Sequence, residues 1–189
     1  MKHVLAATGT AAPTTRCYWV VPGALLAGAY PEDKEPELRG ERAKQLWAAG
    51  IRTFVSLVEV HEHGPGHPNL ARYAPKVEEL AAAAGVRSMC LRFPIPDLGV
   101  TSFEAMATIL DVIDLSLEAK RPVYVHCFGG VGRTGTVVAC WMLRHGLATD
   151  ADVLARLTEL RRADAGAGHR ASPENDGQRA MVRAWRGGR

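Results

Sequence analysis

The chain has 189 residues, 47% of them hydrophobic, and its mean hydropathy of −0.06 is close to zero. These values are typical of a globular protein, and the length fits a single domain over residues 1–189 with a full core. The formal net charge of only +3 excludes the broad basic surface of a nucleic-acid-binding protein. No apolar run approaches the length of a membrane span. We therefore expect a monomer with neither nucleic acid nor a membrane as partner.

The N-terminal residues and the cysteines bear on location. Residues 1–16 are expected to form a flexible N-terminal segment, and Met1–Ala12 lacks the continuous apolar stretch of a signal peptide. The chain has four cysteines, Cys17, Cys90, Cys127 and Cys140. Their spacing fits neither a disulfide framework nor a metal site, and Cys90 and Cys140 lie in apolar patterns that predict core thiols. A reduced, cytoplasmic protein is the expectation.

Strand and helix patterns alternate along the chain. Short apolar or β-branched runs predict strands at 19–21, 24–29, 51–60, 86–93 and 122–126. Helical patterns occupy 40–49, 76–84, 101–119, 133–145, 149–162 and the segment that begins at 172. Thr101 and Glu104 form a capping-box pattern at the start of the third helix. This alternation favours an α/β fold with a mostly parallel sheet covered by helices.

Residues 122–136 carry the most informative pattern. A β-branched strand ends at His126, Cys127 follows it, and a glycine-rich turn leads to Arg133 at the start of an apolar helix. Glycines allow successive N–H groups to point into one concavity, to which the helix adds its positive N-terminal end. These dipoles and Arg133 favour the thiolate of Cys127 over the thiol, and the same groups suit a phosphate-sized dianion.

The segment His-Cys-Phe-Gly-Gly-Val-Gly-Arg-Thr-Gly at 126–135 resembles the His-Cys-x-x-Gly-x-x-Arg-Thr-Gly signature of cysteine-dependent protein phosphatases. The chain is most similar to the small atypical dual-specificity phosphatases, and Trp19–Gly23 and Gly50–Leu57 also look like that family. The resemblance implies the phosphatase fold, with the Cys-x5-Arg loop between a strand and a helix. It also implies that Cys127 is the nucleophile. It assigns phosphate binding to Phe128, Gly129, Gly130, Val131, Gly132 and Arg133. The competing interpretation is a strand-to-helix turn that carries a buried, inert cysteine.

Asp97 is the only acid in the loop Phe93–Thr101, which two prolines and a glycine make stiff. Displacing an alkoxide or phenoxide from phosphorus requires a proton donor, and hydrolysis of a thiophosphate requires a proton acceptor. The loop resembles the general-acid loop of the family, which places Asp97 in that role; otherwise Asp97 is a turn former. Asp111 and Asp114 lie on a helical pattern and are predicted to form its solvated face.

Three further residues are assigned supporting roles by the resemblance. Thr134 is expected to donate its hydroxyl to the Cys127 sulfur, and the alternative is a threonine that satisfies a backbone N–H at the start of the helix. His126 is expected to support the loop rather than transfer protons. Ser172 and Pro173 predict an N-cap and first turn of a helix, one turn into which Gln178 either faces the phosphate site or points to solvent.

The segment Glu59–His67 contains three histidines and two carboxylates. A metal site would need ligand pairs at characteristic spacings, which the segment lacks, so a solvated loop is favoured and no metal is expected. In similar phosphatases the corresponding segment lies beside the phosphate pocket. Glu59 and His61 are therefore candidate substrate-cleft residues.

The combined pattern predicts a cofactor-independent phosphomonoesterase that works through a cysteinyl-phosphate. Its partner is expected to be a phosphorylated protein carrying phosphotyrosine, and also phosphoserine or phosphothreonine. The alternative is a phosphatase of small phosphorylated metabolites such as inositol phosphates, although the loop carries no lysine. A sulfurtransferase also uses a cysteine in an anion-binding loop, and a silent phosphate-binding module is the remaining alternative.

Overall fold

The computed structural model describes residues 11–32, 36–60, 62 and 73–185, and it contains a five-stranded mixed sheet in the order β1-β2-β5-β3-β4. The strands are β1 (Cys17–Val21), β2 (Leu25–Gly28), β3 (Thr53–Ser56), β4 (Met89–Arg92) and β5 (Val123–His126). Only β1 runs antiparallel to its neighbour; the pairs β2·β5, β5·β3 and β3·β4 are parallel. The predicted α/β class and mostly parallel sheet are confirmed.

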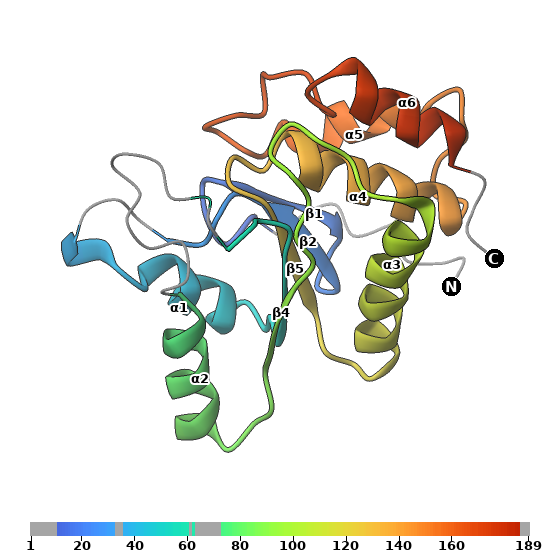
Figure 1. Ribbon diagram of the computed structural model, residues 1–189. Coiled ribbons are helices and arrows are strands. Elements are labelled where there is room, and N and C mark those ends of the chain that lie inside the picture. The colour runs from blue at the N-terminus through green and yellow to red at the C-terminus, as the bar shows by residue number, and fades with distance from the viewer. Residues whose placement is uncertain (1–10, 33–35, 61, 63–72, 186–189) are drawn as a thin grey trace.

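Helices cover both faces of the sheet (Figure 1). The helices α1 (Glu41–Ala48) and α2 (Tyr73–Ala84) lie on one side, and a short 3-10 turn, η1 (Pro36–Leu38), precedes α1. The other side carries α3 (Phe103–Glu118), α4 (Gly132–Arg144), α5 (Val153–Arg161) and α6 (Asp176–Ala184). Among the helices that the structure describes, none combines the length and the apolar character needed to cross a membrane.

The three central strands are aligned residue for residue, so they end together. Gly28, His126 and Ser56 are paired across β2, β5 and β3, and Ser56 is paired with Arg92 of β4. Because these strands are parallel, their carboxyl ends meet at one edge, where ligands of open α/β sheets bind. The segments after β5, β3 and β4 therefore leave from the same place, and these are the three segments that carry the candidate site.

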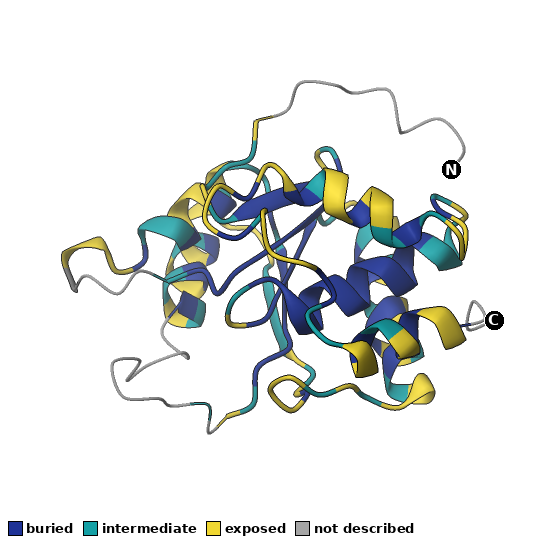
Figure 2. Cartoon of the chain, turned by 90° about the horizontal axis from the view of Figure 1, so that it is seen from above, coloured by how far each residue is buried: buried dark blue, intermediate teal, exposed yellow. Residues whose placement is uncertain are grey.

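Helix α4 is the central helix of the second layer. Every residue from Gly132 to Met142 is buried, and Figure 2 shows this ribbon almost entirely in the colour of buried residues. It packs against α3, α5, α6 and the strands β2 and β5. Because other elements enclose α4 in this way, its N-terminal end is held in a fixed position at the sheet edge.

Two helix starts differ from the prediction. The N-cap of α3 is Ser102, whose hydroxyl accepts from the Ala105 N–H at 3.1 Å, rather than Thr101. The N-cap of α6 is Asn175 rather than Ser172, since the Asn175 side chain accepts from the Gln178 N–H at 3.0 Å. The Ser172 hydroxyl instead donates to the Val131 carbonyl at 2.7 Å. That carbonyl also accepts from the Gly135 N–H at 3.3 Å, and its two lone pairs accommodate both donors.

The prediction that Asp114 lies on a solvated face is also wrong. Its carboxylate accepts from the Trp141 indole N–H at 2.7 Å and contacts His145 Nε2 at 2.9 Å and Arg144 Nη1 at 3.3 Å. These contacts join α3 to the end of α4 and lower the pKa of Asp114 against the opposing effect of burial. Asp111 is exposed as predicted and forms an ion pair with Arg144.

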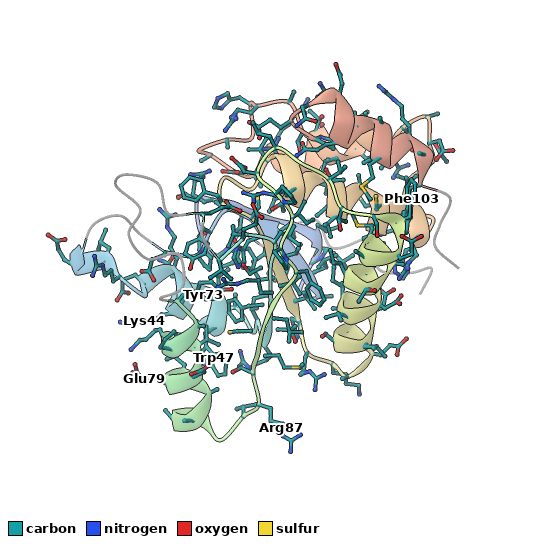
Figure 3. All side chains as sticks on the ribbon, viewed as in Figure 1. Lys44, Trp47, Tyr73, Glu79, Arg87 and Phe103 are labelled. Atoms are coloured by element: carbon teal, nitrogen blue, oxygen red, sulfur yellow. The ribbon has the colours of Figure 1, made fainter. Side chains whose placement is uncertain are left out.

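His126 ends β5 in the middle of an aromatic cluster. Its ring packs against Tyr30, Tyr73 and Tyr124, and it is fully buried. The ring Nδ1 lies 3.2 Å from the Cys127 carbonyl, which can only accept, so Nδ1 carries the proton and Nε2 accepts from the Tyr73 hydroxyl at 2.8 Å. Tyr73 begins α2 (Figure 3). This neutral ring ties β5 to α2, in keeping with the predicted supporting role.

Burial lowers the pKa of His126 from 6.5 to about 3, and this predicts an acid-sensitive fold. Between these values the unfolded chain binds a proton that the folded chain does not, so stability must fall as pH decreases below about 6.5. From pH 7 to pH 5 the loss attributable to His126 is about 2 kcal/mol. His126→Gln lacks this titration. In urea titrations we therefore expect the unfolding free energy of wild type, relative to that of His126→Gln, to fall by that amount from pH 7 to pH 5. A pH-independent difference would contradict the assignment.

Candidate active site

The loop Cys127–Arg133 joins β5 to α4 and forms the floor of the site. Cys127 is 3% exposed, and its sulfur accepts from the Gly130 N–H at 3.3 Å. Helix α4 begins at Gly132, so its positive N-terminal end faces the same loop. The sulfur therefore lies among main-chain donors in a cradle suited to an anion.

Two glycines of this loop are in close contact with neighbouring segments. Gly130 has φ +73°, and a Cβ there would lie 2.5 Å from the Gly28 carbonyl carbon and 2.6 Å from the Ala29 nitrogen. A Cβ at Gly132 would lie 2.8 Å from both amide heteroatoms of Gln178. Gly129 differs, because a Cβ there would meet only the Val131 side chain at 3.9 Å. The loop therefore requires glycine at 130, where the neighbours are main chain, whereas a side chain at 132 would displace the ends of other side chains and one at 129 would find space.

Arg133 is the most heavily bonded side chain in the site. Its guanidinium, 2% exposed, forms a two-pronged ion pair with Glu62, in which Nη2 lies 2.8 Å from Oε2. Its Nη1 also donates to the Ile95 carbonyl at 3.0 Å, and its Nη2 lies 3.0 Å from the Asp97 carboxylate. Burial acts to lower the pKa of Arg133, but the bonds to Glu62 and the nearby Cys127 outweigh it and raise the pKa.

Asp97 lies in a tight turn that α6 holds in position. The Gly99 N–H donates to the Pro96 carbonyl at 2.8 Å, and Leu98 between them has φ +58°. From the start of α6, the Asn175 amide donates to the Leu98 carbonyl at 2.7 Å and the Gln178 amide to the Gly99 carbonyl at 3.2 Å. A left-handed leucine is unfavourable by about 1–3 kcal/mol and persists only where its surroundings impose it. Asn175 and Gln178 supply that constraint.

A pocket of about 160 Å³ lies above the sulfur. Its floor is made by Cys127–Gly129 and Val131–Arg133, and one wall by Asp97 and Leu98. Arg170, Glu174 and Gln178 also line the pocket. The structure thus brings Cys127, Arg133, Asp97 and Gln178, all singled out from the sequence, to one cavity. Gln178 is fully buried, so it does not point to solvent.

Further contacts hold the loop from behind. The Arg16 guanidinium donates to the Gly129 carbonyl at 3.1 Å and to the Asp164 carboxylate at 3.1 Å. The Thr134 hydroxyl donates to the Gly28 carbonyl at 3.4 Å, so its proposed bond to the sulfur stays a prediction. Arg16 lies within the segment expected to be flexible, of which residues 1–10 are outside the described part of the chain.

Of the two candidate cleft residues, His61 lies outside the described residues. Glu59 reaches the site through its main chain, since its N–H donates to the Glu62 carboxylate at 2.8 Å. Their effect on substrate choice stays a prediction.

The other cysteines differ from Cys127 in environment. Burial raises the pKa of Cys90 to about 11 and that of Cys140 to about 12, so both remain thiols at neutral pH. Cys140 is buried in the core as predicted, whereas Cys90 is only half-buried.

Sequence reasoning missed Glu62, Asn175, Arg170 and Glu174. A signal existed for the first, because a buried arginine requires a carboxylate partner and segment 59–67 had been assigned to the cleft. The other three lie in or beside a Gly- and Ala-rich loop with no regular pattern. The resemblance related the segment from Ser172 to the phosphate site through Gln178 alone, and nothing in the sequence singled out these three side chains.

The comparisons with known proteins agree with this geometry. A family model described as PTP-SAK, "Swiss Army Knife protein, DSP-PTPase phosphatase domain", matches residues 14–181. The chain belongs to the PTP-SAK family. The predicted likeness to cysteine phosphatases of the dual-specificity type is thereby confirmed.

Similar curated proteins match over parts of their length. The uncharacterized protein MJ0215 of Methanocaldococcus jannaschii is 40% identical over 62 residues, which are 33% of this chain and 39% of that protein. The mouse protein tyrosine phosphatase domain-containing protein 1 is 30% identical over 130 residues, 66% of this chain and 16% of that protein. The chain thus spans well under two thirds of these relatives.

Solved structures share the fold of this PTP-SAK chain. The active form of Tk-PTP has a TM-score of 0.61 at 24% identity and covers 88% of this chain and 93% of its own. PTPMT1 in complex with PI(5)P has a TM-score of 0.62 at 16% identity and covers 86% of this chain and 90% of its own. At these identities the likeness establishes the fold.

The two loop glycines at 129 and 130 form a matched pair for a stability test. We expect Gly130→Ala to lower the unfolding free energy by about 2 kcal/mol or more, because the new methyl group meets main chain at an unfavourable φ. Gly129→Ala adds the same methyl group where space exists. Equal melting temperatures for the two variants would contradict the close approach of Gly130 to β2.

Glu62→Gln tests the buried ion pair. Removing the bidentate partner leaves the buried guanidinium with the exposed Asp97 as its remaining carboxylate, so we expect a loss of about 3 kcal/mol in stability. We also expect at least about a tenfold fall in kcat/KM for p-nitrophenyl phosphate, since Arg133 loses its orientation. Glu79→Gln, which breaks an exposed pair with Lys76 on α2, is the control. The role of Glu62 fails if the two variants behave alike in both assays.

Proposed function

We propose that this chain hydrolyses phosphate monoesters, chiefly phosphotyrosine in proteins and also phosphoserine and phosphothreonine, through a cysteinyl-phosphate intermediate. The observation that carries the proposal is the convergence of a thiol, a buried arginine and an exposed carboxylate on one small pocket. These groups correspond to a nucleophile, a phosphate-binding cation and a proton donor.

In the first step the Cys127 thiolate attacks phosphorus and the bond to the leaving oxygen breaks. The N–H groups of residues 128–133 and the Arg133 guanidinium hold the other phosphate oxygens, which gain charge in the transition state. Asp97, once released from Arg133, takes up a proton from solvent and transfers it to the leaving oxygen. Asp97 contacts Arg133 in the free protein, so substrate phosphate takes over the arginine and turns the carboxyl group toward the leaving group.

In the second step water attacks the cysteinyl-phosphate. Asp97, now a carboxylate, accepts the proton of that water, and the sulfur–phosphorus bond breaks to return the thiolate and release inorganic phosphate. Thr134 is proposed to donate a hydrogen bond to the departing sulfur, which requires its hydroxyl to turn from the Gly28 carbonyl. Splitting the displacement in two replaces one difficult step by two easier ones.

The mouth of the pocket supports an aromatic phosphate ester as substrate. Leu98 is 57% exposed and Phe128 is 39% exposed, and both line the pocket. Two exposed apolar side chains beside an anion site can hold a phenyl ring between them. The loop also contains no lysine to attract a highly charged headgroup.

A second candidate is a phosphatase of small phosphorylated metabolites such as inositol phosphates. One structural neighbour, PTPMT1, has been solved in complex with PI(5)P, and the pocket here carries a second arginine, Arg170, besides Arg133.

We extend the proposal to one phosphatase domain over residues 1–189 that acts as a cytoplasmic monomer. The unpaired, buried thiols Cys17 and Cys140 support a reducing compartment.

Two variants test the mechanism. Cys127→Ser should abolish turnover, because a serine hydroxyl is a far weaker nucleophile at neutral pH. Asp97→Asn should lower kcat for phenyl phosphate by about 10²–10⁴-fold and much less for p-nitrophenyl phosphate, whose leaving group needs no proton.

Asp111→Asn, a change in an exposed carboxylate on α3, is the control for charge alone. Full turnover by Cys127→Ser would overturn the proposed function. An Asp97→Asn effect that is equal for the two esters would remove Asp97 from the role of acid while leaving the nucleophile in place.

A further inference from the structure

Arg170 lines the same pocket as Cys127 but takes no part in the mechanism above. Its side chain is 48% exposed, in contrast to the 2% of Arg133, and it forms an ion pair with Glu174. The carboxylate of Glu174 lies against the phosphate loop, since a Cβ at Gly132 would be 3.1 Å from its Oε2. A second cation therefore lines the pocket beside the phosphate loop.

The loop that carries Arg170 is fixed by buried hydrogen bonds. Arg161, fully buried at the end of α5, donates to the Arg170 carbonyl at 2.5 Å and to the Ala167 carbonyl at 2.8 Å. Asp164, 1% exposed, accepts from the N–H groups of Gly166 and Ala167, both at 3.1 Å. The main chain at 170 is thus held by groups that solvent does not reach.

The main chain at 174 is fixed independently. The Glu174 N–H donates to the buried Gln178 side chain at 2.9 Å. Ser172, which lies between Arg170 and Glu174 in the chain, donates its hydroxyl to the Val131 carbonyl at 2.7 Å. The loop therefore keeps its shape without the Arg170–Glu174 ion pair. Since an exposed pair of this kind contributes little to stability, its arginine is free to exchange the carboxylate for another anion.

We propose that Arg170 is a specificity-determining residue that binds a second phosphate group of the substrate, beside the phosphate that Cys127 attacks. The inference rests on the proposed phosphatase function and narrows its substrate class to bisphosphorylated molecules. A phosphate dianion offers more charge than Glu174 and accepts a bidentate guanidinium contact, so it displaces the carboxylate. A monophosphorylated substrate leaves the ion pair in place and gains nothing from Arg170.

The second phosphate has the same chemistry on a peptide or on an inositol ring, so the test uses both sources. One pair of probes is a phosphotyrosine peptide and the same peptide with a phosphothreonine two residues away. The other pair is an inositol monophosphate and an inositol bisphosphate with adjacent phosphates. The quantity measured is the ratio of kcat/KM, bisphosphorylated over monophosphorylated, within each pair.

We expect Arg170→Ala to lower this ratio about tenfold in at least one pair, through KM of the bisphosphorylated probe, as for the loss of a charge-assisted hydrogen bond. Arg170→Lys, which keeps the charge without the bidentate geometry, should fall between wild type and Arg170→Ala. Glu174→Gln should raise the ratio, because it removes the competing carboxylate. The pair that responds identifies the source of the second phosphate.

Arg162→Ala is the matched control, since Arg162 is exposed at the end of α5 and pairs with Glu159 away from the pocket. A ratio unchanged in Arg170→Ala, or lowered equally in Arg162→Ala, overturns the inference, while turnover by wild type and none by Cys127→Ser leaves the phosphatase function standing. If wild type hydrolyses none of the four probes, both the function and the inference fail. Melting curves confirm that the variants fold.

Discussion

The guanidinium of Arg133 is the charge on which the rest of the site depends. A side chain with 2% exposure cannot hold a charge unless its donors are paired. Its partners come from two different segments: Glu62 follows β3, and both the Ile95 carbonyl and Asp97 follow β4. These segments start at the same sheet edge because their strands end in register. The arginine then holds them together, so the need to neutralise one buried cation brings the Asp97 loop to the pocket that contains Cys127.

What could be predicted from the sequence was local. The strand before Cys127, the glycines after it and the apolar helix beyond are consecutive, and each element has its own pattern. Gly130 is a clear example, since its φ of +73° and its contact with β2 both demand the residue that the motif contains. Asp97 was found because it is the one acid in a stiff loop. In both cases the pattern that singles out the residue lies within a few positions of it, although the contact of Gly130 with Gly28 joins segments far apart in the chain.

What could not be predicted depends on partners far away in the chain. Ser172 followed by Pro173 has the pattern of a helix start, but the Val131 carbonyl, 41 residues earlier, uses the hydroxyl, and Asn175 caps α6 instead. Asp114 has the spacing of a solvated face, yet Trp141 and His145 on α4 bind it. Periodicity describes which side of a helix is apolar; it says nothing about a polar partner that another helix supplies.

In the free site each arginine of the pocket is paired with a carboxylate, and this pairing favours anions that can displace the carboxylate. Arg133 is paired with Glu62 and Asp97, and Arg170 is paired with Glu174, so each cation of the pocket already has a carboxylate. A singly charged anion gains little by replacing a carboxylate that is already bound to the arginine. A phosphate dianion gains more, because it brings two charges and several acceptor oxygens to donors that are already oriented. In the proposed mechanism, the phosphate that displaces Asp97 from Arg133 also frees the group that protonates the leaving oxygen. Binding of the substrate phosphate and release of the proposed acid are then the same exchange.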